Sequence, residues 1–153
     1  MTILAPRYTL DASVVLNVFN PTEAGHAISL QLQTILQTQA IPVVVPTLLL
    51  TEVAAMIGRV LSDAPRARAF AHHLSRLPYL EWIPLTHMFG LAAADLAAQH
   101  RLRGADAVYA AVALRSGTTL ITLDHEHLTR LTGIVSTRTP ADVLPDLLPS
   151  STP

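Results

Sequence analysis

The spacing of apolar residues along the chain predicts strands that alternate with helices. Short apolar or β-branched runs predict strands at residues 8–10, 41–45, 79–85, 118–123 and 133–136. The intervening patterns predict helices at residues 12–20, 23–39, 47–61, 63–77, 86–101 and 102–114, and a short capped turn at 124–131. Because strands separated by helices build such a fold, we expect an α/β sandwich with a mainly parallel sheet.

Two of the predicted helices are almost wholly apolar, and each contains a single acid. Residues 47–61 read TLLLTEVAAMIGRVL and contain Glu52, whereas residues 102–114 read LRGADAVYAAVAL and contain Asp106. An apolar surface on nearly all sides predicts that helix 47–61 is buried between layers. Burying an unpaired carboxylate costs several kcal/mol, roughly, so both acids need a partner.

Two further acids directly follow predicted strands, and the topology brings all four together. Asp11 follows residues 8–10, and Asp124 follows residues 118–123. In a parallel α/β sheet, ligands bind beyond the carboxyl ends of the strands, and helices begin at that same edge. We expect Asp11, Glu52, Asp106 and Asp124 to converge there. The alternatives are that Asp11 is a helix cap and that Glu52 turns to solvent or pairs with a distant arginine.

Converging carboxylates repel one another, and a divalent cation supplies the missing positive charge. An all-oxygen site suits Mg²⁺ or Mn²⁺ better than Zn²⁺. The chemistry expected of such a site is hydrolysis of a phosphodiester. Any cationic contact to the phosphate must come from arginine because the chain has no lysine. Arg101 and Arg103 are the nearest in sequence, although both also fit an ordinary solvated helix end.

The amino-acid composition narrows the possible classes of protein and of enzyme. The 153 residues suit one domain, which we place at residues 1–138, followed by a proline-rich tail at 139–153 that is at least partly disordered. The absence of cysteine excludes a disulfide framework and a cysteine nucleophile. The net charge is −1, and setting aside four metal-bound acids leaves ten arginines against seven acids, or +3. No signal peptide or transmembrane run is visible, so a cytoplasmic location is expected.

Four short segments together resemble a PIN domain, and more narrowly a VapC-type toxin ribonuclease of a type II toxin–antitoxin system. They are LDAS at 10–13, TEVA at 51–54, GADAVYAAVAL at 104–114 and TLITLD at 119–124. The resemblance implies a three-layer α/β/α sandwich, with Asp11, Glu52, Asp106 and Asp124 as metal ligands. It also implies that Ser13 orients Asp11 or a metal-bound water.

The activity implied by the resemblance is endonucleolytic cleavage of RNA that depends on Mg²⁺ or Mn²⁺. Toxins of this family usually form homodimers and are held inactive by a cognate antitoxin. The high hydrophobic content, 50% of residues, fits such partners. The RNA substrate, the number of metal ions and the antitoxin stay open, as does a non-catalytic PIN-like module that binds RNA or protein.

Residues 125–127 depart from the family pattern. Glu126 is a candidate extra ligand, and His125 and His127 are candidate substrate contacts; the alternative is that all three are polar residues of a helix start. Two rival enzyme classes fit less well. A haloacid-dehalogenase-like phosphatase needs a second Asp two residues after Asp11, where this chain has Ser13. A receiver domain needs a lysine, which this chain lacks.

Overall fold

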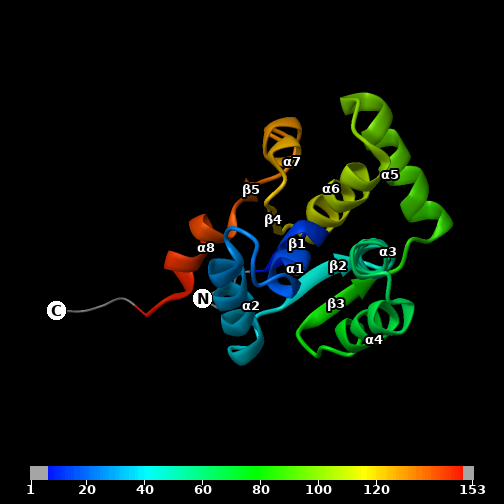
Figure 1. The fold of residues 1–153 in the computed structure, drawn as a ribbon. Helices are drawn as coiled ribbons and strands as arrows, with labels where there is room; N and C mark the ends of the chain where they lie inside the picture. Colours follow the sequence, from blue (N-terminus) through cyan, green and yellow to red (C-terminus); the bar gives the residue numbers. More distant parts are fainter. Residues whose placement is uncertain (1–6, 150–153) are drawn as a thin grey trace.

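The computed structural model describes residues 7–149, which build a five-stranded sheet between helices (Figure 1). The strands are Tyr8–Leu10 (β1), Val43–Pro46 (β2), Leu80–Ile83 (β3), Thr119–Ile121 (β4) and Thr137–Arg138 (β5). Their order is β3-β2-β1-β4-β5, and every neighbouring pair is parallel. The expected parallel α/β architecture is therefore confirmed.

The helices alternate with the strands as the apolar spacing predicts. They are Ala12–Phe19 (α1), His26–Thr38 (α2), Leu48–Leu61 (α3), Ala64–Leu74 (α4), His87–His100 (α5), Gly104–Ser116 (α6), His125–Arg130 (α7) and Pro140–Leu147 (α8). Gly117 ends α6 in the left-handed conformation, with φ of 62° and no Cβ to oppose it. No helix among residues 7–149 is long and apolar enough to cross a membrane.

Alternate strand residues face opposite layers, as the pleat of a sheet requires. Leu10 and Val43 pack into one core, which α1, α2, α3, α4 and α8 supply from one face. Val44, between its neighbours in β2, instead packs with residues of α5 and α6 on the other face. Leu120 packs with Tyr109 of α6 on that second face. These two cores make the molecule a three-layer α/β/α sandwich.

The order in which strands are added to the sheet reverses between β1 and β4. From β1, the chain adds β2 and then β3 on one side, whereas β4 and β5 lie on the other side. Such a switch point leaves a crevice at the carboxyl ends of the two central strands. Asp11 directly follows β1, and its backbone N–H donates to the carbonyl of Ile121 at the end of β4, at 3.0 Å. The fold therefore places the predicted site at this crevice.

Two local expectations were wrong. The last strand is not residues 133–136 but β5, because Gly133 adopts a left-handed turn conformation with φ of 82°. Helix α3 is not buried on all sides: Leu49, Val53 and Ile57 enter the core, but Met56 and Val60 are 39% and 68% exposed. An apolar pattern all round a helix identifies no single buried face, and here one apolar side of α3 remains uncovered.

The proline-rich segment, which we expect to be at least partly disordered, forms α8 within the described residues. Pro140 occupies the first turn, where its missing N–H costs nothing. Thr139 and Asp142 form a reciprocal capping box. Val143 and Leu144 are buried in the core. Figure 1 shows α8 beside α2, which it contacts. Residues 150–153, the remainder of the predicted tail, lie outside the described residues.

Candidate active site

Asp11 is a buried carboxylate held by two hydroxyl groups. Its side chain is on the N-cap residue of α1, and the residue is 5% exposed. Its Oδ2 accepts hydrogen bonds from Ser13 Oγ at 2.6 Å and from Thr122 Oγ1 at 3.0 Å. It also caps the helix by accepting from Ser13 N at 3.4 Å. The helix-cap and site interpretations of Asp11 are therefore compatible, and Ser13 makes the contact that its expected orienting role requires.

Asp106 lies in the first turn of α6 and is also 5% exposed. The partial positive charge of a helix start favours a carboxylate at this position. Asp106 Oδ1 accepts a hydrogen bond of 2.5 Å from His127 Nε2. Asp106 Oδ2 is buried, and it has no hydrogen-bond partner among the described residues. A buried carboxylate oxygen without a partner is a candidate cation ligand.

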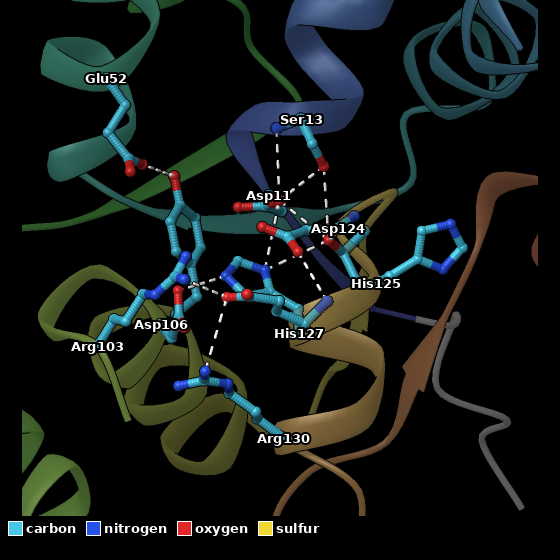
Figure 2. Close-up of polar contacts among 12 residues, drawn as sticks. Asp11, Ser13, Glu52, Arg103, Asp106, Asp124, His125, His127 and Arg130 are labelled. Atoms are coloured by element: carbon cyan, nitrogen blue, oxygen red, sulfur yellow. Dashed lines mark hydrogen bonds and ion pairs between the residues drawn. The ribbon is translucent and has the colours of Figure 1, made fainter. Parts of the chain in front are cut away.

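His127, on α7, connects the two buried aspartates (Figure 2). Its Nδ1 lies 3.4 Å from Asp11 Oδ2 and 3.3 Å from Thr122 Oγ1, whereas its Nε2 contacts Asp106. Burial alone would lower the pKa of His127, but the hydrogen bonds and charges of both aspartates outweigh burial and raise that pKa to about 9. Burial raises the pKa of Asp11, but hydrogen bonds from His127, Ser13 and Thr122 reverse this and lower it overall.

Glu52 reaches the same region from α3 and is held by Tyr109 of α6. The Tyr109 hydroxyl donates to Glu52 Oε2 at 2.6 Å, and Tyr109 itself is fully buried. Glu52 is half-buried, so neither expected alternative, a solvated carboxylate or an arginine pair, describes it. Burial raises the pKa of Glu52, and the charges of Asp11 and Asp106 act in the same direction, opposed by the Tyr109 hydrogen bond.

Asp124 follows β4 and caps α7. Its Oδ1 accepts from the backbone N–H of Glu126 at 2.8 Å, and its own N–H donates to Thr122 Oγ1 at 3.0 Å. Asp124 and Ser13 line the same surface groove, which places Asp124 on the Asp11 side of the crevice. Asp124 therefore lies at the expected sheet edge, where it starts α7 and fixes the helix that presents His127.

The side chains of the site are of the types that bind a divalent cation, but they are not arranged around one point. Buried carboxylate oxygens on Asp11 and Asp106 are the ligands that Mg²⁺ and Mn²⁺ prefer. The unpartnered Oδ2 of Asp106 is available to such an ion. However, no group of three or more His, Asp or Glu side chains within residues 7–149 is arranged to hold a metal ion. The residue types fit the metal, and His127 stands between the two most buried ligands.

Three charged residues border the site. Glu126 pairs with Arg103 at 2.6 Å and, more weakly, with Arg130 at 3.9 Å. The candidate role of Glu126 as an extra metal ligand therefore does not match its position, because its carboxylate contacts arginines. Arg103 is the N-cap residue of α6, three residues before Asp106. The role of Arg103 as a phosphate contact stays a prediction, because its guanidinium pairs with Glu126 and its side chain is 59% exposed.

Sequence reasoning missed two residues of this site, Tyr109 and Thr122, and it missed the position of His127 between the two aspartates. Tyr109 stands one turn after Asp106 on the same helix, and Thr122 immediately precedes Leu123 and Asp124 after β4. His127 stands three residues after Asp124. Only Tyr109 has a local signal, because it lies one helical turn after Asp106 on the same helix. The contacts of Thr122 and His127 join segments far apart in the sequence.

If the chain cleaves RNA, as its resemblance to a PIN domain implies, changing Tyr109 to Phe should lower the catalytic efficiency of that cleavage about tenfold, by analogy with other residues that orient metal ligands. The ring remains to fill the core, but Glu52 loses its hydrogen-bond donor. Steady-state kinetics on a labelled RNA would measure this effect. The matched control is Tyr79→Phe, which alters a buried tyrosine outside the site. Equal activity of the Tyr109→Phe and Tyr79→Phe proteins would show that Glu52 needs no orientation by Tyr109.

The sheet with a switch point and the buried aspartates at its edge define an α/β protein with a candidate acidic active site, and comparison identifies the family. The PIN domain model matches residues 8–133, so the chain belongs to the PIN domain family. No curated protein sequence matches the chain.

Solved structures of toxin–antitoxin proteins share the fold. VapBC2 from Rickettsia felis, bound to a promoter DNA fragment, has a TM-score of 0.63 and 16% identity over 87% of this chain and 98% of that one. VapC20 from Mycobacterium tuberculosis, described as a sarcin–ricin loop cleaving toxin, has a TM-score of 0.66 and 18% identity over 79% and 92%. A toxin–antitoxin complex from Klebsiella pneumoniae has a TM-score of 0.61 and 17% identity over 87% and 97%. At these identities the likeness establishes the fold.

Proposed function

We propose that this protein is a Mg²⁺- or Mn²⁺-dependent endoribonuclease and the toxin of a toxin–antitoxin pair, acting on RNA in the cytoplasm. The observation that carries the proposal is the pair of buried aspartates, Asp11 and Asp106, at the switch point of a PIN-domain sheet. Two carboxylates buried this close to each other are costly for a merely structural role, since each loses hydration. The family membership and the toxin-like neighbours support nuclease chemistry at this position.

Each side chain of the site has a separate task in the proposed reaction. A bound divalent ion lowers the pKa of water and neutralises the charge that builds on the phosphate. Asp11 and Asp106 would hold that ion, with Glu52 and Asp124 completing its surroundings. Ser13 and Thr122 fix the orientation of Asp11 by donating to Oδ2. Tyr109 fixes Glu52 in the same way.

Arg103 is placed to bind the RNA backbone. Its side chain is 59% exposed and paired with Glu126 next to the start of α6. Changing Arg103 to Gln should weaken RNA binding uniformly across sequences and reduce the salt slope of log K by about one, as expected for the loss of one phosphate contact. Fluorescence anisotropy with a labelled RNA at several salt concentrations measures both quantities. Arg76→Gln, at an exposed position after α4, is the matched control; an unchanged slope in the Arg103→Gln protein would contradict the assignment.

An apolar groove beside the site supports the proposed antitoxin partner. It has a volume of about 590 Å³ and is lined by residues of α1 and α3, with Ser13 and Asp124 among its polar lining residues. Met56, Val60 and Leu61 expose apolar surface along it. A peptide segment of an antitoxin lying in this groove would cover the apolar face and reach the acids. We also propose a homodimer, and exposed Met88, Leu91 and Leu114 on α5 and α6 offer a second apolar surface for it.

The proposed function is tested with purified protein, verified to be free of antitoxin, and a pool of structured RNAs labelled at the 5′ end. Discrete internal cleavage products support an endoribonuclease. RNA binding without cleavage under all metal conditions would overturn it in favour of the non-catalytic module. The same assay on pools enriched in transfer, ribosomal or messenger RNA would identify the substrate class, since recognition depends on loops and unpaired bases.

A further inference from the structure

The imidazole of His127 occupies the space between Asp11 and Asp106, which the proposed function assigns to a cation. Its Nε2 contacts Asp106 Oδ1 at 2.5 Å, and its Nδ1 lies 3.4 Å from Asp11 Oδ2. Figure 2 shows the ring between the two carboxylates. Both aspartates therefore already have a partner within the chain, although one Asp106 oxygen remains free of hydrogen bonds among the described residues.

The ring is held in this position by several contacts. His127 is 5% exposed, and Thr122 Oγ1 lies 3.3 Å from its Nδ1. The Tyr109 ring lies beside it, with 6.4 Å between the ring centroids. Asp124 caps the helix that carries His127, through the N–H of Glu126. Burial and these contacts therefore fix the position of the His127 ring. In contrast, His125, two positions earlier on the same helix, is exposed.

This position of the ring is incompatible with one ion that joins Asp11 and Asp106 through the same oxygens. Two oxygens bound to one Mg²⁺ lie within about 4 Å of each other, since each bond is about 2.0–2.1 Å. An imidazole that contacts one carboxylate with each nitrogen holds those oxygens apart. The ring therefore accounts for the lack of a three-ligand metal group among residues 7–149 despite suitable ligands.

We propose that His127 is a built-in plug of the metal site, and that one ion is held by both Asp11 Oδ2 and Asp106 Oδ1 only when the imidazole leaves the space between these two oxygens. This inference rests on the proposed metal-dependent function. A ligand that needs a minor conformation binds with an apparent affinity reduced by the population of that conformation. His127 therefore lowers the affinity of the site for its ion. A chain without the ring has the space permanently open.

The two possible roles of His127, as a plug of the metal site and as a metal ligand, predict different effects of removing its imidazole. If His127 were itself a ligand, removing the imidazole would weaken binding of Mn²⁺, because one donor would be lost. As a plug, the same change strengthens binding. The two roles therefore give opposite signs in one measurement.

The experiment is isothermal titration calorimetry with Mn²⁺ at one fixed pH, on the full chain and on its His127→Ala and His125→Ala variants. We expect His127→Ala to bind Mn²⁺ at least about tenfold more tightly than the unmodified protein, which corresponds to a ring-out population of about 10% or less. His125→Ala should bind as the unmodified protein does. Equal or weaker binding by His127→Ala, with circular dichroism showing that it is folded, overturns the plug.

A second measurement keeps the inference testable should His127→Ala fail to fold. NMR of the unmodified protein with Mg²⁺ follows the proximity of the His127 and Tyr109 rings. The plug predicts that saturating Mg²⁺ removes their cross-peaks and shifts the His127 ring signals; a ring that stays in place in the Mg²⁺-bound protein overturns it. Failure of the proposed function is distinguishable, because then neither the unmodified protein nor His127→Ala binds Mn²⁺ or cleaves RNA.

Discussion

Changing Asp106 to Asn should reduce RNA cleavage at least about 1,000-fold and leave the protein folded. The amide keeps the size of the side chain and an oxygen that can accept the hydrogen bond from His127 Nε2. It removes the negative charge that would hold the divalent ion. Metal-ion catalysis contributes several kcal/mol, and about 4 kcal/mol of lost transition-state stabilisation corresponds to about three powers of ten in rate.

Single-turnover cleavage of a labelled RNA at saturating Mn²⁺ measures this effect. Asp95→Asn is the matched control, because it makes the same chemical change at an exposed position of α5. Circular dichroism and a thermal melt verify the fold of both variants. If the Asp106→Asn protein retains more than a tenth of the normal cleavage rate, Asp106 is not a residue of the active site.

Truncating Val143 and Leu144 together to alanine should lower the free energy of unfolding by about 3–6 kcal/mol. Both side chains belong to the core beneath α2, with Val143 fully buried and Leu144 9% exposed. Large-to-small changes in a core lose transfer free energy and leave a cavity, about 2–5 kcal/mol for a single leucine. Typical domains have only about 5–15 kcal/mol in total, so the double variant should be close to unfolding at 37 °C.

Chemical denaturation followed by circular dichroism measures this loss. Leu148→Ala is the matched control, because Leu148 ends the same helix but is 42% exposed. We expect that control to change the free energy of unfolding by less than about 1 kcal/mol. A double variant as stable as the Leu148→Ala protein would mean that α8 contributes nothing to the core.

The sequence predicts the layered fold because its signals are local. A run such as VVV at 43–45, buried on both faces, is typical of a central parallel strand. Asp11 and Asp124 could be placed at one sheet edge because each follows such a run and parallel strands end together. The position of Asp106 in the first turn of an apolar helix added a third acid. The spatial neighbourhood of these acids followed from topology alone.

Other features depend on contacts that local patterns do not contain. Residues 139–153 contain four prolines, yet Pro140 and the Thr139–Asp142 capping box start a helix whose apolar side completes the core. The apolar side of α8 is buried because it packs against α2, and the sequence of residues 139–153 contains no sign of that distant contact. The uncovered side of α3 is equally invisible, since a uniformly apolar helix does not reveal which side lacks a neighbour.

In the candidate site too, some features follow from local sequence patterns and others depend on tertiary contacts. Each carboxylate could be named, but its partner could not: Tyr109 reaches Glu52 from another helix, and His127 reaches Asp11 and Asp106 across the sheet edge. Histidine is intermediate between the buried and the exposed residue types, so a histidine at the start of a short helix is not predicted to be buried. Only the position of α7 just after β4, where Thr122 contacts the ring, makes His127 the neighbour of both acids.

The most direct test of a metal-dependent ribonuclease is RNA cleavage by antitoxin-free protein as a function of Mn²⁺ concentration, with EDTA as the starting condition. We predict no cleavage in EDTA, cleavage that rises and saturates with added Mn²⁺, and no rise in the Asp11→Asn and Asp106→Asn proteins. Cleavage that persists in EDTA, or that both variants retain, would contradict the assignment of Asp11 and Asp106 to a metal-dependent active site.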